Sequence, residues 1–292
     1  MGPLRRHAKS MNPLGLLGLL LALSASTVSA DVPGPLGLQL ESFKRRLGVD
    51  VPSGLDLVKS EGFALVETAG TYKLTPQQFR AQLDAHGLRA VGSHFSYEAL
   101  QSDLPKVIAD AKALGSTNVV VPNIPHEGVF DEAVARRTAA DFNAWARVLK
   151  GSGIRFLYHP HGGEFQPLPG GGNGFDVLMK ETDPGLVFFE MDVFWVVYAG
   201  QDPVRVLEKY PGRWKMFHLK DVRKGARTGI FTGRAPIGDF VAIGTGQVDW
   251  PAVLAEGRKV GIEYSIIEDE SSDPAENIPP SVRYLESIKL AR

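Results

Sequence analysis

The chain has 292 residues, 43% of them hydrophobic, which is sufficient for a domain with a sizeable buried core. Its 32 Lys and Arg residues nearly balance its 33 Asp and Glu residues, so the formal net charge is -1, and no basic stripe follows the first ten residues. Because nucleic-acid binding requires many cations on one surface, this pattern argues against a nucleic-acid partner. The chain contains no cysteine, so its stability must come from its core without disulfides.

The first thirty residues form a segment of distinct composition. Arg5, Arg6 and Lys9 provide a positive start, an apolar run follows at 14–23, and the small, polar stretch "SASTVSA" ends at Ala30. This order is typical of a secretory signal peptide that is cleaved after Ala30. An uncleaved membrane anchor is the alternative, but the apolar run is shorter than the ~20 residues that span a bilayer.

We therefore predict a signal peptide over residues 1–30 and a single mature domain over residues 31–292. The mature protein is expected to be secreted or periplasmic and to lack a stable membrane anchor. Residues 1–30 are left out of the fold prediction for this reason.

From residue 36 onward, short apolar segments alternate with longer amphipathic ones. The clearest helix is 75–87, with Thr75 as N-cap, Pro76 at the first helical position and Gly87 at the end. Strands that alternate with helices indicate a parallel sheet. The expected strands are 36–42, 63–70, 88–96, 117–124, 154–159, 185–193, 214–221 and 264–270.

The helices expected between and after these strands complete eight repeated units. Eight such units in about 260 residues favour a closed (β/α)8 TIM barrel over an open sheet. A doubly wound sheet is the alternative, but "ESFKRRLG" after the first strand has no glycine-rich dinucleotide turn. The expected helices are 53–62, 75–87, 97–114, 131–150, 174–182, 203–212, 250–261 and 280–290, with a long loop at 222–246.

Polar residues follow nearly every expected strand, at the end of the barrel where catalytic groups are found. Five of the seven histidines lie at these ends, which exceeds what random placement predicts. Each residue alone has a simpler explanation as an ordinary polar strand end or a solvated side chain. The set in chain order is Glu41, Glu67, His94, Asn123, His126, Glu127, His159, His161, Glu164, Glu190, Asp192, Trp195, His218, Lys220, Asp221, Glu268 and Glu270.

Together, these carboxylates and imidazoles predict a site for one divalent metal ion. Mn, Zn, Co, Fe and Mg accept ligands of these types, and the sequence does not choose among them. Carboxylates that converge from several strands repel one another, and an ion of charge +2 relieves that repulsion.

Several segments together resemble one family, the sugar phosphate isomerases/epimerases of the xylose isomerase-like TIM barrel superfamily. They are "YHPHGGEF", "EMDVFWVVYAGQDP", "RWKMFHLKD", "GTGQVDW" and "IIEDE", in order over nearly the whole mature chain. The resemblance implies a metal held by Glu164, Asp192, His218 and Glu268. Many relatives carry a glutamate where His159 stands here, so His159 or His161 is the alternative to Glu164 as the ligand from the fifth strand.

The resemblance also implies the chemistry. Members are metal-dependent enzymes that remove a proton beside a sugar carbonyl, so Glu164, Glu268, Lys220 and His161 are the expected catalytic residues. We expect an isomerase or epimerase of a sugar or keto-sugar. A lyase or hydratase acting on keto-glycosides and a non-catalytic secreted sugar-binding protein are the alternatives. The expected substrate-binding residues are His94, His159, Trp195, Glu67 and Asn123.

Overall fold

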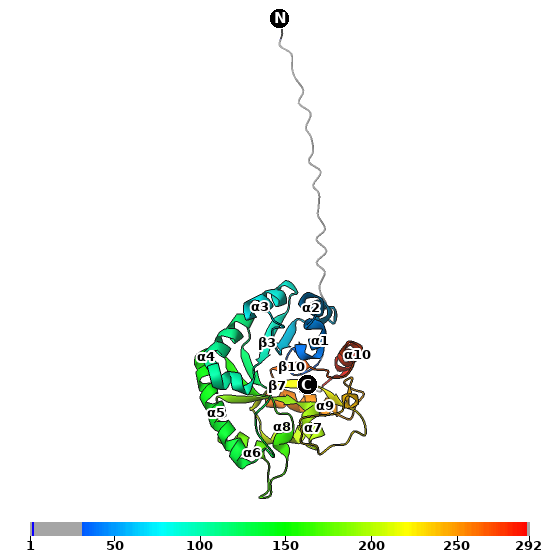
Figure 1. Cartoon of the computed structure of the whole chain (residues 1–292). Coiled ribbons are helices and arrows are strands. Elements are labelled where there is room, and N and C mark those ends of the chain that lie inside the picture. Colours follow the sequence, from blue (N-terminus) through cyan, green and yellow to red (C-terminus); the bar gives the residue numbers. More distant parts are fainter. Residues whose placement is uncertain (1, 3–30, 291–292) are drawn as a thin grey trace.

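The protein, seen in a computed structural model that describes residue 2 and residues 31–290, is a closed barrel of parallel strands (Figure 1). The strand order around the barrel is β1-β10-β7-β6-β5-β4-β3-β2, so the first and last strands meet. This confirms the predicted (β/α)8 TIM barrel. The strands are β1 (Leu36–Gln39), β2 (Leu65–Thr68), β3 (Arg89–His94), β4 (Asn118–Val121), β5 (Arg155–Tyr158), β6 (Val187–Asp192), β7 (Trp214–Leu219) and β10 (Tyr264–Ile267).

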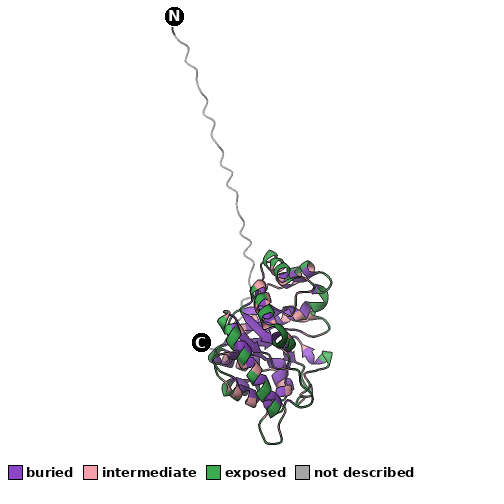
Figure 2. Ribbon diagram, turned by 60° about the vertical axis from the view of Figure 1, so that its left-hand side comes forward, coloured by how far each residue is buried: buried purple, intermediate pink, exposed green. Residues whose placement is uncertain are grey.

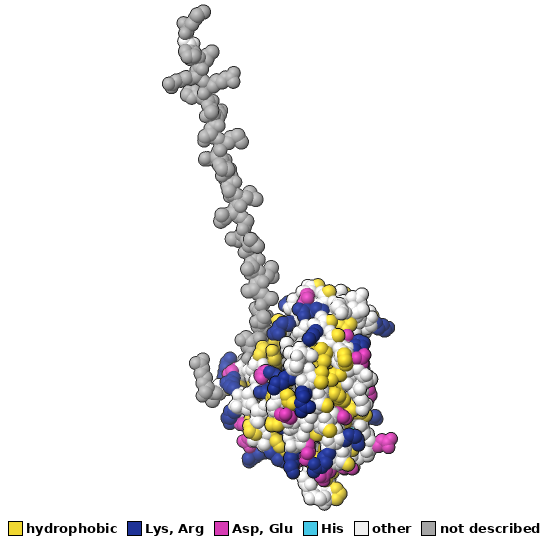
Figure 3. All heavy atoms as spheres, turned by 90° about the vertical axis from the view of Figure 1, so that its left-hand side faces the viewer, with side chains coloured by type: hydrophobic (Ala, Val, Ile, Leu, Met, Phe, Trp, Pro, Cys, Tyr) yellow, Lys and Arg dark blue, Asp and Glu magenta, His cyan; other side chains and the backbone are white. Residues whose placement is uncertain are grey.

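Helices surround the strands, with their buried faces against the barrel and their exposed faces outward (Figure 2). Basic and acidic side chains are interspersed over the face shown in Figure 3. No helix in the described part of the chain has the length and apolar character that a bilayer span requires. The helices are α1 (Lys44–Leu47), α2 (Val51–Ser60), α3 (Pro76–Ala85), α4 (Tyr97–Leu114), α5 (Glu132–Gly151), α6 (Gly174–Glu181), α7 (Val193–Tyr198), α8 (Pro203–Lys209), α9 (Trp250–Val260) and α10 (Pro274–Ser287).

Local capping chemistry explains where two of the helices begin. Thr75 accepts a hydrogen bond from the Gln78 amide, and the Gln78 side chain accepts one from the Thr75 amide, so the predicted start of α3 is confirmed. The predicted N-cap of the preceding helix, Ser53, is wrong. The Asp50 side chain accepts from the Ser53 amide, so α2 begins at Val51 instead.

The last helix also differs from the prediction, which placed its start at Pro280. α10 begins six residues earlier, at Pro274, and continues through Pro279 and Pro280. Its continuation is explained by packing, because Ile278, Ser281, Val282 and Leu285 are buried on one side of the helix. The prolines each remove one backbone donor but do not prevent this face from docking.

The segment after β6 and the long loop after β7 contain short elements that the sequence did not predict. "VFWVVY" forms helix α7, although its continuous apolar run is also compatible with a strand. The loop 222–246 contains part of a small antiparallel pair, β8 (Asp221–Val222) with β9 (Phe240–Val241), and a 3-10 turn, η3 (Ile237–Asp239). An apolar cluster that includes Phe194, Trp195 and Phe240 holds this loop against α7.

Candidate active site

The polar residues at the carboxyl ends of the barrel strands point into one buried cluster. β-Strand side chains alternate between faces, so residues two apart along a strand share the barrel interior. Three neighbouring interior positions lie in register across β6, β7 and β10, where Asp192 pairs with His218 and His218 with Ile266. The members that are 7% exposed or less are Gln39, Glu67, His159, Glu190, Asp192, His218, Lys220 and Glu268.

Two carboxylates at the base of this cluster hold three histidines. Glu190 Oε2 lies 2.9 Å from His159 Nδ1, 3.2 Å from His218 Nε2 and 3.5 Å from His94 Nε2. Glu67 Oε2 lies 2.6 Å from His218 Nε2 and 3.2 Å from His94 Nε2. These contacts fix the orientations of the three rings. His159 contacts Glu190 through Nδ1 and His218 contacts it through Nε2, so the second ring nitrogen of each is left for the rest of the cluster.

Gln39 is a member of this base that the sequence interpretation missed. Its Nε2 donates to Glu67 Oε2 at 2.8 Å, and the side chain is fully buried. The predicted first strand was 36–42, with Glu41 as the polar residue at its end, but β1 ends at Gln39, and Glu41 lies on a 3-10 turn, η1 (Leu40–Phe43). A lone glutamine inside the apolar segment "LGLQL" was the available signal.

A second group lies directly above this base and contains three candidate metal ligands. Ligand atoms of Asp192, His218 and Glu268 all lie within 4.8 Å of one another. His218 Nδ1 is 2.9 Å from Glu268 Oε2 and 4.0 Å from Asp192 Oδ2. The Lys220 ammonium bridges the two carboxylates, 2.9 Å from Asp192 Oδ2 and 2.7 Å from Glu268 Oε2.

Two buried atoms beside this group lack hydrogen bonds, and they make His159 the fourth candidate ligand. His159 Nε2 makes no hydrogen bond, and Asp192 Oδ2 accepts none, although it is ion-paired with Lys220. The two atoms are 3.5 Å apart. Buried polar atoms are rarely left unpaired without a functional reason. A set of two imidazoles and two carboxylates suits Mn, Zn, Co or Fe, so His159, Asp192, His218 and Glu268 fit a divalent ion.

The structure does not bring Glu164 into this group. Gly162, at φ +92°, turns the chain after β5, and Glu164 then lies on the 3-10 turn η2 (Gly163–Phe165). Its Oε1 accepts a hydrogen bond from Tyr158 Oη. Within residues 31–290, a second cluster of potential metal ligands consists of His94, His159, Glu190 and His218. Neither this cluster nor the group of Asp192, His218 and Glu268 includes Glu164. His159, which directly follows β5, occupies that strand's place in the site.

The charges of the cluster depend on one another. Burial disfavours the Asp192 carboxylate, but Lys220 and His159 outweigh it and lower the pKa of Asp192 to about 2. Burial also disfavours the Lys220 ammonium, yet Asp192 and Glu268 raise the Lys220 pKa well above its usual value. His161 differs, because burial and the neighbouring His159 lower its pKa to about 3, so it is neutral at neutral pH.

A cavity of about 380 Å³ opens above the cluster and reaches the protein surface. His94, Asn123, His159, His161, Lys220 and Glu268 line it. Two of the predicted substrate-binding residues lie elsewhere among the described residues. Glu67 is fully buried beneath the histidines, and Trp195 is packed 5.5 Å from the His161 ring. Both positions suit residues that support the site from behind.

Asp221 has a structural role that explains the "GTGQVDW" segment. Its carboxylate accepts hydrogen bonds from the amides of Gly244 at 2.9 Å and Gly246 at 3.1 Å, and from Trp250 Nε1 at 2.9 Å. A Cβ at Gly246 would lie 2.2 Å from Asp221 Oδ1, so only glycine fits there. This buried carboxylate thus anchors the long loop beside the mouth.

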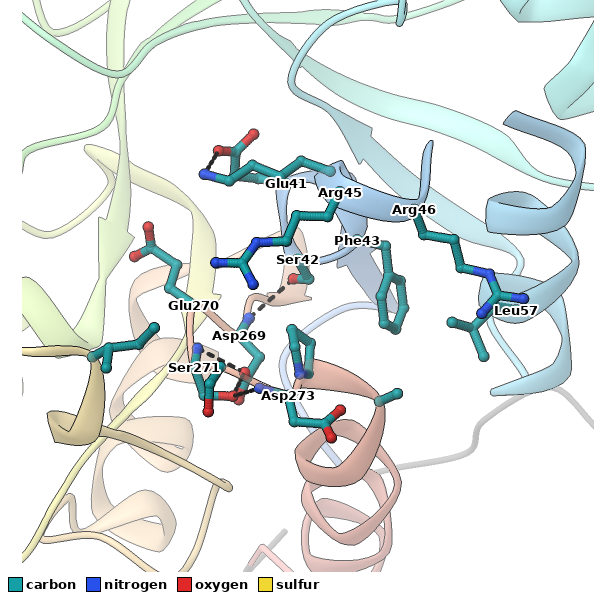
Figure 4. Close-up of a pocket in the computed structure, with 15 residues that line it drawn as sticks. Glu41, Ser42, Phe43, Arg45, Arg46, Leu57, Asp269, Glu270, Ser271 and Asp273 are labelled. Carbon is teal, nitrogen blue, oxygen red and sulfur yellow. Dashed lines mark hydrogen bonds and ion pairs between the residues drawn. The ribbon is translucent and has the colours of Figure 1, made fainter. Parts of the chain in front are cut away.

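A side cavity beside the mouth is shown in Figure 4 and has a volume of about 380 Å³. Glu41 and Glu270 line both this side cavity and the mouth. The Asp269 amide donates to Ser42 Oγ at 3.0 Å, which ties the end of β10 to the turn after β1. The side cavity therefore lies where the first and last strands close the barrel.

Comparisons with known proteins agree with this fold. The family model described as xylose isomerase-like TIM barrel matches residues 55–288. The chain therefore belongs to the xylose isomerase-like TIM barrel family, which confirms the resemblance seen in the sequence.

The relatives it matches are enzymes. An inosose dehydratase of Clostridium tetani is 30% identical over 167 residues, which span 54% of each chain, or about half of that relative. An inosose dehydratase of Clostridium beijerinckii is 25% identical over 73% of this chain and 80% of the relative. A crystal structure of a sugar phosphate isomerase/epimerase from Parabacteroides distasonis superimposes with a TM-score of 0.71 at 26% identity, covering 91% of this chain and 99% of that one.

Proposed function

We propose that the protein is a metal-dependent enzyme that removes a proton from the carbon beside the carbonyl of a sugar or cyclitol ketone. The observation that carries this proposal is the group of Asp192, His218 and Glu268, with His159 beside it, beneath an open cavity. Two of these side chains have a buried atom without a hydrogen bond, His159 Nε2 and Asp192 Oδ2. The ion would be Mn, Zn, Co or Fe, held by these four residues. His159 replaces Glu164 in the ligand set, for the geometric reason given above.

When bound, the ion would supply Lewis-acid polarisation of the substrate oxygens. The chain's own residues supply the rest. Lys220 brings a buried ammonium to the floor of the cavity, where it can stabilise negative charge on a substrate oxygen. His94 and Asn123, which also line the cavity, can hold substrate hydroxyls by hydrogen bonds.

Two groups are positioned to move the proton. Glu268 follows β10 and His161 follows β5, and β6 and β7 separate these strands in the barrel. Both side chains line the cavity, so they approach a substrate from different sides. One would take the proton and the other would return it, to the neighbouring carbon for isomerisation or to the opposite face for epimerisation.

Dehydration is the second candidate reaction, and the inosose dehydratases among the relatives favour it. It begins with the same proton removal, and the hydroxyl group of the next carbon then receives a proton and leaves as water. The same cavity serves both reactions, so the two differ in where the substrate presents its leaving group.

We also propose that the protein is exported. This rests on the sequence pattern alone, since the predicted signal peptide lies outside the described residues except for residue 2. An exported enzyme would meet free sugars, keto-sugars or glycosides more readily than phosphorylated sugars.

Metal analysis and solvent-deuterium exchange test the proposal. Purified protein, loaded with Mn²⁺ or Zn²⁺, is incubated in D₂O with a panel of ketoses, inososes and keto-glycosides. We expect deuterium to enter the carbon beside the carbonyl only with metal present. Glu268→Gln should reduce exchange by at least about 100-fold, because it removes a ligand and proton-transfer group. The matched control Glu263→Gln, at the opposite end of the barrel, should retain full exchange.

Exchange that proceeds equally without metal would contradict the proposed mechanism. A protein that binds sugars from the panel without exchanging any proton would instead be a sugar-binding module. These two results are separated by measuring binding and exchange on the same preparation.

A further inference from the structure

A second side cavity, of about 690 Å³, adjoins the mouth on the side away from the barrel closure. It shares Pro122, Asn123 and His161 with the mouth, so the two spaces are continuous. Its remaining lining includes Glu164, Gln166 and Arg234. We call it the β5-side cavity.

Glycines at the end of β5 allow a distant loop to form one wall of this cavity. A Cβ at Gly162 would lie 3.0 Å from the Trp195 carbonyl oxygen, and one at Gly163 would lie 3.2 Å from the Phe231 carbonyl oxygen. A Cβ at Gly233 would lie 3.4 Å from His161 Cβ. The segment around Phe231 therefore packs closely on the "HGGEF" turn, and a larger residue at 163 would push it away, whereas one at 162 would press against α7.

The β5-side cavity contains polar atoms that the protein itself does not satisfy. Glu164 is 6% exposed, and its Oε2 has no hydrogen-bond partner. His161 Nδ1 is likewise buried without a partner. Buried polar groups in proteins usually have a hydrogen-bond partner, so such atoms usually meet a ligand or water. The Arg234 guanidinium, on the exposed rim, makes no hydrogen bond or ion pair with any described residue.

The cavity of Figure 4 lacks this feature, although it also adjoins the mouth. Its Asp269 oxygens accept hydrogen bonds from Ser271 and Asn277, and Glu270 is paired with Lys220 at 2.8 Å. Of the described residues that line it, none has a buried side-chain atom without a partner. Its polar groups are already satisfied within the protein, whereas the wall of the β5-side cavity holds two buried atoms without a partner.

We propose that the β5-side cavity binds a second hydroxylated ring, so that the substrate is a two-ring glycoside rather than a free monosaccharide. A sugar hydroxyl both donates and accepts hydrogen bonds, and the cavity offers both kinds of partner. Glu164 Oε2 is an acceptor, whereas Arg234 and the Asn123 and Gln166 amides can donate. Phe231 and Ile124 supply apolar surface for the ring face. The volume is within the range of small-molecule sites.

This inference rests on the proposed function, because it extends the same site from one ring to two. The ring that reacts would lie over His159 and Glu268, and the second ring would lie against Glu164. His161 stands between the two spaces and lines both, so it would contact the bond that joins the rings.

Binding measurements on unreactive sugars test the second-ring site directly. The probes are methyl β-D-glucoside, cellobiose, maltose and sophorose, titrated calorimetrically into metal-loaded wild-type protein. We expect at least one disaccharide to bind about tenfold more tightly than the methyl glucoside. Arg234→Ala and Gln166→Ala should each weaken disaccharide binding several-fold. Neither substitution should change the affinity for methyl glucoside. Arg227→Ala, an exposed arginine on the same loop, is the matched control and should change neither.

The second-ring site is overturned if no disaccharide exceeds the methyl glucoside, or if Arg234→Ala and Gln166→Ala weaken both probe types equally. Failure of the proposed function has a different signature. If disaccharides bind as expected but no sugar exchanges deuterium, the second-ring site stands and the catalytic proposal falls. If keto-monosaccharides exchange deuterium but no disaccharide binds more tightly than methyl glucoside, the catalytic proposal stands and the second-ring site falls.

Discussion

The barrel interior contains an apolar layer and a charged layer. The same strands contribute to both, two residues apart. The lower layer is a fully buried apolar cluster of Val91, Val120, Leu157, Met216 and Ile266. The upper layer follows two positions later on three of these strands, where His159, His218 and Glu268 replace Leu157, Met216 and Ile266. Because side chains alternate between the two faces of a strand, residues two apart both point into the barrel. A move of two residues along these strands therefore leads from the apolar core to the charged site.

The two layers also differ in what they contribute to stability. Burial of the lower layer removes apolar surface from water and stabilises the fold. The upper layer buries charges, which costs free energy unless each is paired. Four carboxylates there share one lysine ammonium and three imidazoles. Burial disfavours charge on the imidazoles, but the neighbouring carboxylates outweigh it and raise the pKa of His94 to about 10 and the pKa of His218 well above its usual value, so an ion bound by His218 would displace a proton. The carboxylates are Glu67, Glu190, Asp192 and Glu268.

The largest effect on folding is expected from a cavity in the lower layer. Leu157 is 0% exposed, and Leu157→Ala should reduce the free energy of unfolding by about 2–5 kcal/mol, measured by urea denaturation. Leu157→Met keeps the volume and should cost less than about 1.5 kcal/mol. If Leu157→Ala reduces the free energy of unfolding by less than Leu157→Met does, packing of the lower layer does not stabilise the barrel.

A somewhat smaller effect is expected from metal binding to the upper layer. At a free Mn²⁺ or Zn²⁺ concentration of 100 times Kd, the wild-type protein should gain about 2.7 kcal/mol against unfolding, because the ion binds only the folded site. Leu157→Ala should gain the same amount from its lower baseline, since the two layers act separately. Asp192→Asn removes a ligand charge and should gain little. Equal gains for wild type and Asp192→Asn would place the ion elsewhere.

The sequence predicts the barrel well, because its strands and helices depend on patterns that are local. Alternation within strands and the capping sequence at Thr75 and Pro76 are each encoded within a few residues. The end of β1 was less visible, because Gln39 and Glu41 share a face in any extended strand. Only the turn at η1, which depends on packing, separates their roles.

The ligand from β5 illustrates the limit of sequence reasoning more clearly. Glu164 and His159 are both acceptable metal ligands by chemistry, and their spacing permits either. The choice depends on the left-handed turn at Gly162 and on Tyr158, which holds Glu164 by a hydrogen bond. The turn at Gly162 packs against Trp195 of α7, and the Tyr158 ring packs against Phe142 and Phe189, all of which lie far from the turn in the sequence.

The smallest of these effects comes from a residue that positions a ligand without touching the ion. Glu190 Oε2 lies 2.9 Å from His159 Nδ1, so it favours a proton on Nδ1 and leaves the Nε2 lone pair directed toward Asp192. Glu190→Gln should weaken metal affinity by about 10- to 100-fold, or about 1.4–2.7 kcal/mol, in a competition titration with a chelating dye. Glu164→Gln is the matched comparison and should change affinity little. If Glu164→Gln weakens the metal while Glu190→Gln does not, the ligand from this strand is Glu164, and the upper layer must rearrange when the ion binds.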